Sequence, residues 1–236
     1  MSLNTRAITQ FTRCLTTSKE AKTFTMNSFN RIIKYIFDRI TALLGLVVLA
    51  LPLLVIAILV KRSVKGESVI FRQTRVGKDG RLFDIHKFRT MTNDKEVSTI
   101  AYPNRARVTP IGAKLRRRKL DELPELWDVL LGNMSFVGPR PDVPGYADQL
   151  QGDDRVVLKM RPGITGPATL KYRDEEQLIE RYVCEAIAKG DPRPEEEIAL
   201  QFNDEVIYPD KVRINVDYYK NYSFLKDLSI ILKTIL

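Results

Sequence analysis

The chain has 236 residues and a formal charge of +9, with 38 Lys and Arg against 29 Asp and Glu. This length suffices for one medium-sized domain with its own core and an additional segment. Two distant cysteines exclude a disulfide framework and fit a reducing compartment. A single histidine excludes sites that need two imidazoles and argues against a Ser-His-Asp triad. Any enzymatic chemistry must therefore rely mainly on carboxylates and cations.

The charge is concentrated in the middle of the chain. Residues 61–119 hold 17 basic and 5 acidic side chains, whereas residues 120–236 hold 14 and 22. So basic a block favours anionic lipid headgroups or phosphorylated substrates as partners. Nucleic acid is the less favoured alternative, because the second half is acidic and an apolar segment precedes the block.

That apolar segment runs from Ile40 to Val60, 21 residues without a charge. As a helix it would be about 31 Å long, close to the thickness of a bilayer core. Pro52 in its middle predicts a kink, and basic residues on both sides conflict with the positive-inside rule for a spanning helix. We therefore expect a helix-break-helix that enters and leaves one leaflet; a plain spanning helix and a buried core helix are the alternatives.

The segment divides the chain into three parts. Residues 1–28, rich in Thr and Ser, predict a mobile tail. Residues 29–62 predict the membrane helix-break-helix, led in by an amphipathic interfacial helix over Phe29–Arg39. Residues 63–236 predict a catalytic domain on the membrane surface.

A β-hairpin is predicted directly after the membrane segment. Two β-rich runs, from Ser68 to Gln73 and from Leu82 to Phe88, flank Lys-Asp-Gly at 78–80. The hairpin carries four cations, which either converge on one site or form a basic face against lipid: Arg72, Arg75, Lys87 and Arg89.

A basic run, Arg116–Lys119, then leads directly into the adjacent carboxylates Asp121 and Glu122. Cations can hold phosphate, and a carboxylate can act as nucleophile or metal ligand. An amphipathic helix is predicted to follow, with Pro124 in its first turn and Gly132 as its stop. Its other carboxylates fall on the face opposite the apolar stripe, which predicts that they are solvated: Glu125 and Asp128.

Two rigid loops follow. Gly138-Pro139-Arg140-Pro141 fixes one arginine, and in residues 161–167 the glycines are expected to allow close approach of a ligand. Helices are predicted over residues 175–189, 195–206 and 225–236. The predicted fold class is α/β in the α+β sense, mostly helical with a small β-hairpin or sheet.

Taken in order, these motifs resemble the bacterial sugar transferase family, the monotopic phosphoglycosyl transferases, over residues 30–236. The matching motifs are Phe71-Arg72-Gln73 with Arg75-Val76-Gly77, residues 87–91, Leu115-Arg116, residues 120–124, residues 132–141 and residues 162–166, behind an apolar segment with a central proline.

The resemblance implies transfer of a sugar-1-phosphate from a UDP-sugar to polyprenyl (undecaprenyl) phosphate, with release of UMP, at the cytoplasmic face of the inner membrane. It also implies a re-entrant membrane helix. Asp121 would be the covalent nucleophile, and Asp121 with Glu122 would hold Mg²⁺. We predict that phosphate and substrate are bound by Lys87, Arg89, Arg116, Arg140 and Arg161.

Two departures put the identity of the sugar in doubt. Lys119 stands where the family commonly has Ser, and Pro167-Ala168 follows Thr-Gly where an aromatic residue is common. We expect no nucleic-acid partner, and a homo-oligomer is left open. The alternative function is a non-enzymatic membrane module whose basic block binds anionic lipid or a partner.

Overall fold

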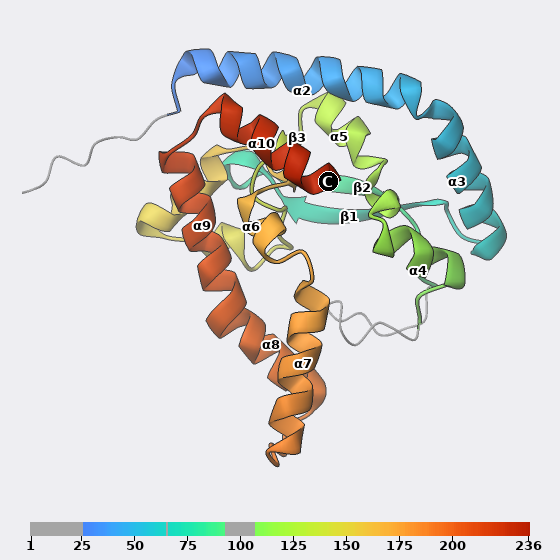
Figure 1. The fold of residues 1–236 in the computed structure, drawn as a ribbon, viewed down its shortest axis with the longest axis vertical. Helices are drawn as coiled ribbons and strands as arrows, with labels where there is room; N and C mark the ends of the chain where they lie inside the picture. The colour runs from blue at the N-terminus through green and yellow to red at the C-terminus, as the bar shows by residue number, and fades with distance from the viewer. Residues whose placement is uncertain (1–25, 65, 93–106) are drawn as a thin grey trace, which may run out of the picture.

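The computed structural model describes residues 26–64, 66–92 and 107–236. It begins with two helices, α2 (Ser28–Val48) and α3 (Ala50–Ser63), which meet at Leu49. α2 runs along one edge of the molecule, and α3 turns away from its end (Figure 1). Pro52 in the first turn of α3 lacks an N–H for the Val48 carbonyl, and its ring crowds that oxygen. The predicted break in the helix is therefore confirmed, three residues before the proline.

No helix in the described part of the chain is long and apolar enough on its own to cross a membrane. α2 and α3 together pass that test of length and composition, but they are bent by 64°. The predicted tail lies almost wholly outside the described residues, and so does most of the loop between Met91 and Pro110.

The predicted hairpin is confirmed as β1 (Ile70–Val76) paired antiparallel with β2 (Leu82–Phe88). Its tip is the single turn η1 (Lys78–Gly80), where Asp79 and Gly80 have φ of 58° and 77°. Directly opposed residues share a face of the sheet. Phe71 lies opposite Lys87, and Arg75 opposite Phe83, so these four side chains share one face.

Arg72 lies opposite His86, which precedes Lys87 in β2. Because successive side chains of a strand point to opposite faces, Arg72 lies on the other face of the hairpin from Lys87. It is exposed. The expectation that all four hairpin cations converge is therefore wrong for Arg72.

After the undescribed loop come α4 (Pro110–Arg117), η3 (Leu120–Glu122) and α5 (Glu125–Leu131). The Thr109 side chain caps α4 by accepting a hydrogen bond from the Gly112 N–H at 3.0 Å. Gly132 ends α5 with φ of 94°, as predicted. α5 packs on both α2 and β2, which fixes the position of this stretch between the long helix and the hairpin.

Two short parallel strands, β3 (Ser135–Val137) and β4 (Gly163–Thr165), join the two rigid loops. A Cβ on Gly163 would lie 2.2 Å from the Gly138 nitrogen, and one on Gly166 would lie 2.2 Å from the Gly138 carbonyl oxygen. These glycines therefore admit the neighbouring backbone. The prediction that they make room for a ligand is replaced by this packing role.

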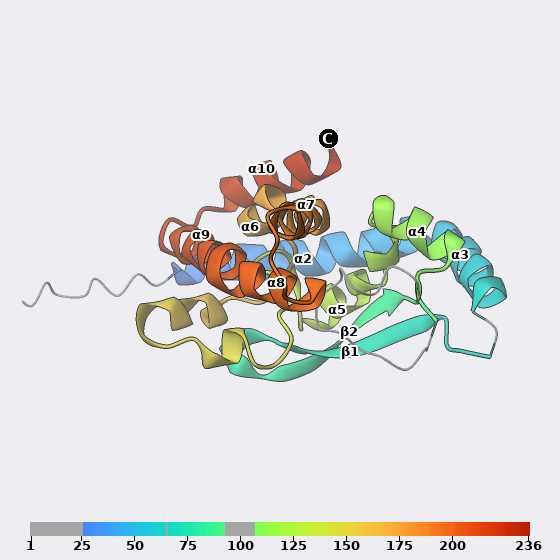
Figure 2. The ribbon, with the colours of Figure 1, turned by 90° about the horizontal axis from the view of Figure 1, so that it is seen from below.

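The rest of the chain is helical and includes the short turns that precede β4. In chain order these elements are η4 (Ala147–Gln149), η5 (Gly152–Lys159), α6 (Pro167–Lys171), α7 (Glu175–Ala188), α8 (Glu195–Phe202), the π-helical turn η6 (Asn203–Ile207), α9 (Tyr208–Lys220) and α10 (Phe224–Ile235). α7 and α8 project away from α2 (Figure 1). The hairpin and α10 lie on opposite sides of the molecule (Figure 2). The described part is mostly helical with two small sheets, as the α+β prediction states.

A buried polar cluster ties α2 to α9 and α10. The Lys34 Nζ lies 2.6 Å from the Asp227 Oδ2, and the hydroxyls of Tyr218 and Tyr222 also donate to Asp227. Lys34 and Asp227 are both buried. Lys34, one of the basic residues before the apolar segment, thus has a protein partner instead of facing lipid.

Candidate active site

The site is built on the stretch from α4 to α5, where the chain reverses at Lys119. Lys119 has φ of 56°, a left-handed conformation that is uncommon for a residue with a side chain. α4 therefore ends at Arg117, two residues before the basic run ends. The short helix η3, which carries Asp121 and Glu122, begins directly after Lys119. The two carboxylates therefore sit on a short, tightly bent segment between two helices.

Glu122 is buried and receives two cations from distant parts of the chain. The Lys87 Nζ, from β2, lies 2.9 Å from the Glu122 Oε1, and the Arg140 Nη2, from the loop after β3, lies 2.6 Å from the same oxygen. Burial alone would raise the pKa of Glu122, but these two charges hold it well below its usual range. Glu122 is thus a fixed negative charge that aligns two cations.

Glu125 also belongs to this cluster. Its side chain is 2 % exposed, and its Oε1 lies 3.2 Å from the Lys87 Nζ. Burial raises the pKa of Glu125 to about 7, and the nearby Glu122 carboxylate adds to the shift while Lys87 opposes it. Because Arg140 forms its ion pair with Glu122 and not with Glu125 among the described residues, the proton favours Glu125 and the negative charge favours Glu122.

Asp128 is completely buried against the hairpin. Its Oδ2 accepts the backbone N–H of His86 at 2.9 Å, and its Oδ1 lies 2.7 Å from the His86 ring nitrogen Nδ1. The prediction of a solvated face for Glu125 and Asp128 is therefore wrong. The face opposite the apolar stripe packs on β2, and Asp128 holds that strand in place next to Lys87.

Asp121 adjoins the cluster, and its Oδ1 is buried without a hydrogen-bond partner in the described part of the chain. Burial, followed by the Glu122 charge, raises the pKa of Asp121, whereas Lys87 and Lys119 lower it. The net shift of the Asp121 pKa is upward, because burial and the second carboxylate outweigh the nearby cations.

The loop of Arg140 is held by Arg75, one of the hairpin cations. The Arg75 Nη1 donates to the Pro141 carbonyl at 3.2 Å, and its Nη2 donates to the Gln73 Oε1 at 2.6 Å. On the other side, the Gly163 N–H donates to the Pro139 carbonyl at 2.8 Å. Arg140 is thus positioned from both the hairpin and β4.

The other predicted phosphate-binding residues make different contacts. Arg89 lies 2.8 Å from Glu67 at the base of the hairpin, and Arg116 lies 2.5 Å from Glu176 of α7. The Arg161 Nε donates to the Gly132 carbonyl at 2.8 Å. In the described part of the chain, none of these three contacts the carboxylates that Lys87 and Arg140 hold.

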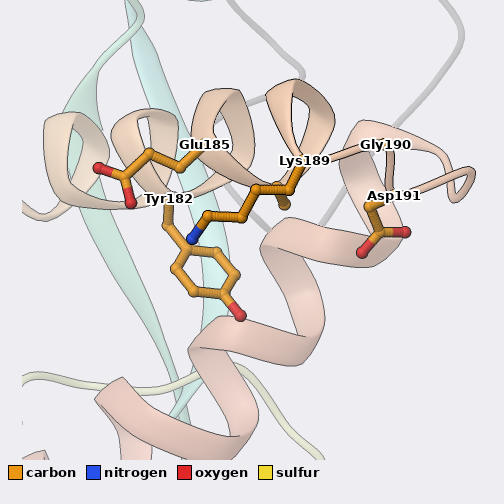
Figure 3. A pocket seen from close by; sticks show the side chains of 6 residues that line it. Tyr182, Glu185, Lys189, Gly190 and Asp191 are labelled. Atoms are coloured by element: carbon orange, nitrogen blue, oxygen red, sulfur yellow. The ribbon is translucent and has the colours of Figure 1, made fainter.

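A hollow elsewhere on the surface has no relation to this cluster. It measures about 400 Å³ and lies at the end of α7, where Figure 3 shows Tyr182, Glu185 and Lys189 beside the turn at Gly190 and Asp191. α7 projects away from α2 and α5 (Figure 1). The chemistry of the buried carboxylates and cations therefore defines the candidate site better than this hollow does.

Comparison with known proteins identifies the family. The model of the family described as "Bacterial sugar transferase" matches residues 29–236, which include every residue of the cluster. The chain belongs to this family. The resemblance drawn from the motifs is thereby confirmed.

Named members of the family include sugar-1-phosphate transferases. The chain is 43 % identical over 163 residues to "UDP-glucose:undecaprenyl-phosphate glucose-1-phosphate transferase" of Escherichia coli (strain K12), and 41 % identical over 163 residues to a protein of the same name in Klebsiella pneumoniae. Each match covers 66 % of this chain but only 35 % of the relative. "Exopolysaccharide production protein ExoY" of Sinorhizobium fredii is 31 % identical over 221 residues, covering 86 % of this chain and 84 % of the relative.

Asp121 and Glu122 are too few to complete the coordination of a hard cation, which would need further ligands. No group of three His, Cys, Asp or Glu side chains gathers as a metal site in the described residues. Mg²⁺ needs no such group, since it is commonly bound by one or two carboxylates with water and substrate phosphates. The unpartnered, buried Oδ1 of Asp121 beside Glu122 fits that donor set.

Proposed function

We propose that the chain transfers a sugar-1-phosphate from a UDP-sugar to polyprenyl phosphate. The observation that carries the proposal is the site itself: Asp121, whose Oδ1 is buried without a hydrogen-bond partner in the described part of the chain, lies beside two cations that Glu122 aligns. Phosphoryl transfer requires mainly positioning and neutralisation of charge, which such a site supplies. The names of the relatives, which act on UDP-glucose and undecaprenyl phosphate, support the same substrate classes.

The reaction would proceed in two steps through Asp121. Its carboxylate oxygen attacks the phosphorus that carries the sugar, the bond from that phosphorus to the UMP oxygen breaks, and UMP leaves. An oxygen of polyprenyl phosphate then attacks the same phosphorus, and the bond to Asp121 breaks. The two steps take UDP-sugar and polyprenyl phosphate in turn, so the two substrates need not occupy the site together.

The residues around Asp121 have distinct tasks in this proposal. Lys87 and Arg140, which Glu122 holds in place, offset the charge of the substrate phosphates. The raised pKa of Asp121 makes its carboxylate more basic and thus a stronger nucleophile. Asp121 and Glu122 would hold Mg²⁺, which supplies Lewis-acid neutralisation of the phosphate oxygens.

We propose further that α2 and α3 enter the cytoplasmic leaflet of the inner membrane as a re-entrant pair. Large apolar side chains near the bend are highly exposed, including Val48 at 75 % and Leu51 at 71 %. Soluble proteins rarely expose continuous apolar patches of this kind. α5, which packs on α2, also exposes Trp127 and Leu131, so the apolar surface extends beyond the bent pair.

The test of the transfer reaction is UMP release. Membranes containing the chain, incubated with UDP-sugars, Mg²⁺ and polyprenyl phosphate, should release UMP and form a lipid-linked sugar diphosphate. Asp121→Asn should abolish the release, whereas Asp153→Asn, the same change at an exposed position, should leave it intact. No UMP release with any nucleotide sugar would reject the proposed reaction.

A further inference from the structure

A second cationic site lies apart from the carboxylate cluster, where α2 passes the hairpin tip. It is a cavity of about 310 Å³ between α2, η1 and the segment that joins η5 to β4. Tyr219 of α9 and Ser135 of β3 contribute to its wall. Its charged lining consists of Arg31, Lys34, Asp38, Lys78, Asp79, Lys159 and Arg161.

Both carboxylates that line the cavity already have partners within the protein. Asp38 accepts the backbone N–H of Phe136 at 3.3 Å, and Asp79 lies 3.8 Å from Lys78. Lys34 has its own partner, Asp227, outside the lining.

Three cations of the lining, Arg31, Lys159 and Arg161, form no ion pair within the described residues. The cavity therefore presents three cations that no carboxylate of the described residues pairs with.

Arg161 of the lining has a second arginine, Arg39, close to it. The guanidinium carbons of Arg39 and Arg161 lie 3.8 Å and 5.1 Å from the centre of the Tyr35 ring. The Arg39 Nη1 is buried and has no hydrogen-bond partner in the described part of the chain. Burial and the charge of Arg39 lower the pKa of Arg161. Such a pair of like charges would be stabilised by an anion.

α2, which supplies Arg31 to the cavity lining, also exposes large apolar side chains next to that residue in the sequence. On that helix, Phe29 is 66 % exposed and Ile32 is 59 % exposed, one turn or less from Arg31. A ligand that reaches both surfaces must join a phosphate-like group to a hydrocarbon chain. A purely soluble anion would leave the apolar side chains without a partner.

We propose that this cavity binds the phosphate of an anionic membrane phospholipid, whose acyl chains lie along the exposed side of α2. The site is separate from the cluster around Glu122, because no residue of that cluster lines the cavity. The inference depends on the proposed membrane association but not on the transfer reaction. Basic pockets beside membrane helices commonly bind anionic headgroups.

The test compares binding of the purified full chain to vesicles of phosphatidylcholine with and without phosphatidylglycerol. The wild type should prefer the anionic vesicles by roughly tenfold or more. Arg31→Gln/Lys159→Gln removes two exposed cations of the cavity and should lose most of that preference. Arg161 and Arg39 are left unchanged because both are partly buried against other side chains.

The matched control is Lys61→Gln/Arg62→Gln, which removes the same charge from exposed positions at the end of α3. It should retain most of the preference if the cavity is a site, and equal losses in the two variants would overturn the proposal in favour of diffuse attraction. A second control, Arg181→Gln on α7 with Lys189→Gln directly after it, should have no effect. Circular dichroism should show that all of these variants are folded, and Lys159→Gln alone serves if the double variant is not.

Two further measurements separate the alternatives. If glycerol phosphate in solution shifts the thermal unfolding midpoint of the wild type but not of the cavity variant, without any vesicle preference, the site takes soluble phosphate and the lipid proposal fails. UMP release in detergent should be unchanged in the cavity variant. Loss of UMP release in Asp121→Asn with the vesicle preference intact would support the two sites as independent, and absence of activity in every form would reject only the transfer reaction.

Discussion

Glu125→Gln should stabilise the protein at high pH, because the native carboxylate is charged in a place that disfavours charge. The pKa of Glu125 rises from 4.5 to about 7 in the folded chain. Since one pKa unit corresponds to about 1.4 kcal/mol, ionised Glu125 lowers the unfolding free energy by about 3 kcal/mol. This figure already includes the attraction of Lys87, and the amide removes the charge while keeping the shape.

The sign of the pH dependence follows from proton binding. Between pH 4.5 and about 7 the folded state holds a proton on Glu125 that the unfolded state has released. The unfolding free energy of the wild type therefore falls as pH rises through this window. The variant lacks this contribution, so the two proteins should have similar stability at low pH and diverge by up to about 3 kcal/mol above neutrality.

The assay is urea unfolding in detergent across this pH range, with the difference between variant and wild type as the readout. Taking the difference cancels the other titrating groups. Glu196→Gln, an exposed carboxylate in the first turn of α8, is the matched control and should shift nothing. A variant that is less stable than the wild type by the same amount at every pH would refute the reasoning, because Glu125 would then be an ionised, net stabilising partner of Lys87.

Three other outcomes follow from the structure. Lys34→Met leaves the buried carboxylate of Asp227 without its cation and should cost about 3–5 kcal/mol of unfolding free energy, most of which Lys34→Met/Asp227→Asn should recover; denaturant unfolding measures both. Gly138→Ala should lower the thermal unfolding midpoint, since its Cβ would lie 2.3 Å from the carbonyl oxygen of Arg161, two residues before β4. An unchanged midpoint would contradict the tight β3–β4 packing. Arg140→Gln should slow UMP release by about 10²–10³-fold, and Arg116→Gln by much less because its contact is with α7, so equal losses would place both arginines at the phosphates.

Local chemistry made several elements predictable from the sequence. Lys78, Asp79 and Gly80 specify a tight turn, and Gly132 specifies a helix end, because few residues accept the required backbone conformations. Pro52 likewise predicts the break between α2 and α3, since it removes a hydrogen bond wherever the rest of the chain lies. These features depend on neighbours within a few residues.

The burial of the acidic face of α5 could not be predicted in the same way. Spacing at three and four residues is the same whether a helix face meets water or another strand. Glu125 becomes buried because Lys87, 38 positions earlier, is brought against it by the hairpin. The one available signal was that Glu125 lies three residues after Glu122, so that both carboxylates face the same side.

The separation of Arg161 from Arg140 has a similar origin. Each arginine stands next to a proline in a rigid loop that also holds glycine. From the sequence alone, both were therefore predicted to bind phosphate. The parallel pairing of β3 and β4 turns the two loops in different directions, so that Arg140 reaches Glu122 and Arg161 reaches the α2 side. Strand pairing between distant segments is a property of the whole fold.

The most direct test of the account is to supply UDP-sugar and Mg²⁺ without any lipid acceptor and to measure the intact mass of the protein. A covalent phosphosugar on Asp121 predicts one added phosphosugar per chain, released UMP in equal amount, and loss of both signals in Asp121→Asn. Addition of polyprenyl phosphate should then return the protein to its original mass. UMP release by Asp121→Asn at the wild-type rate, or release only after the acceptor is added with no change in protein mass, would contradict the proposed role of Asp121.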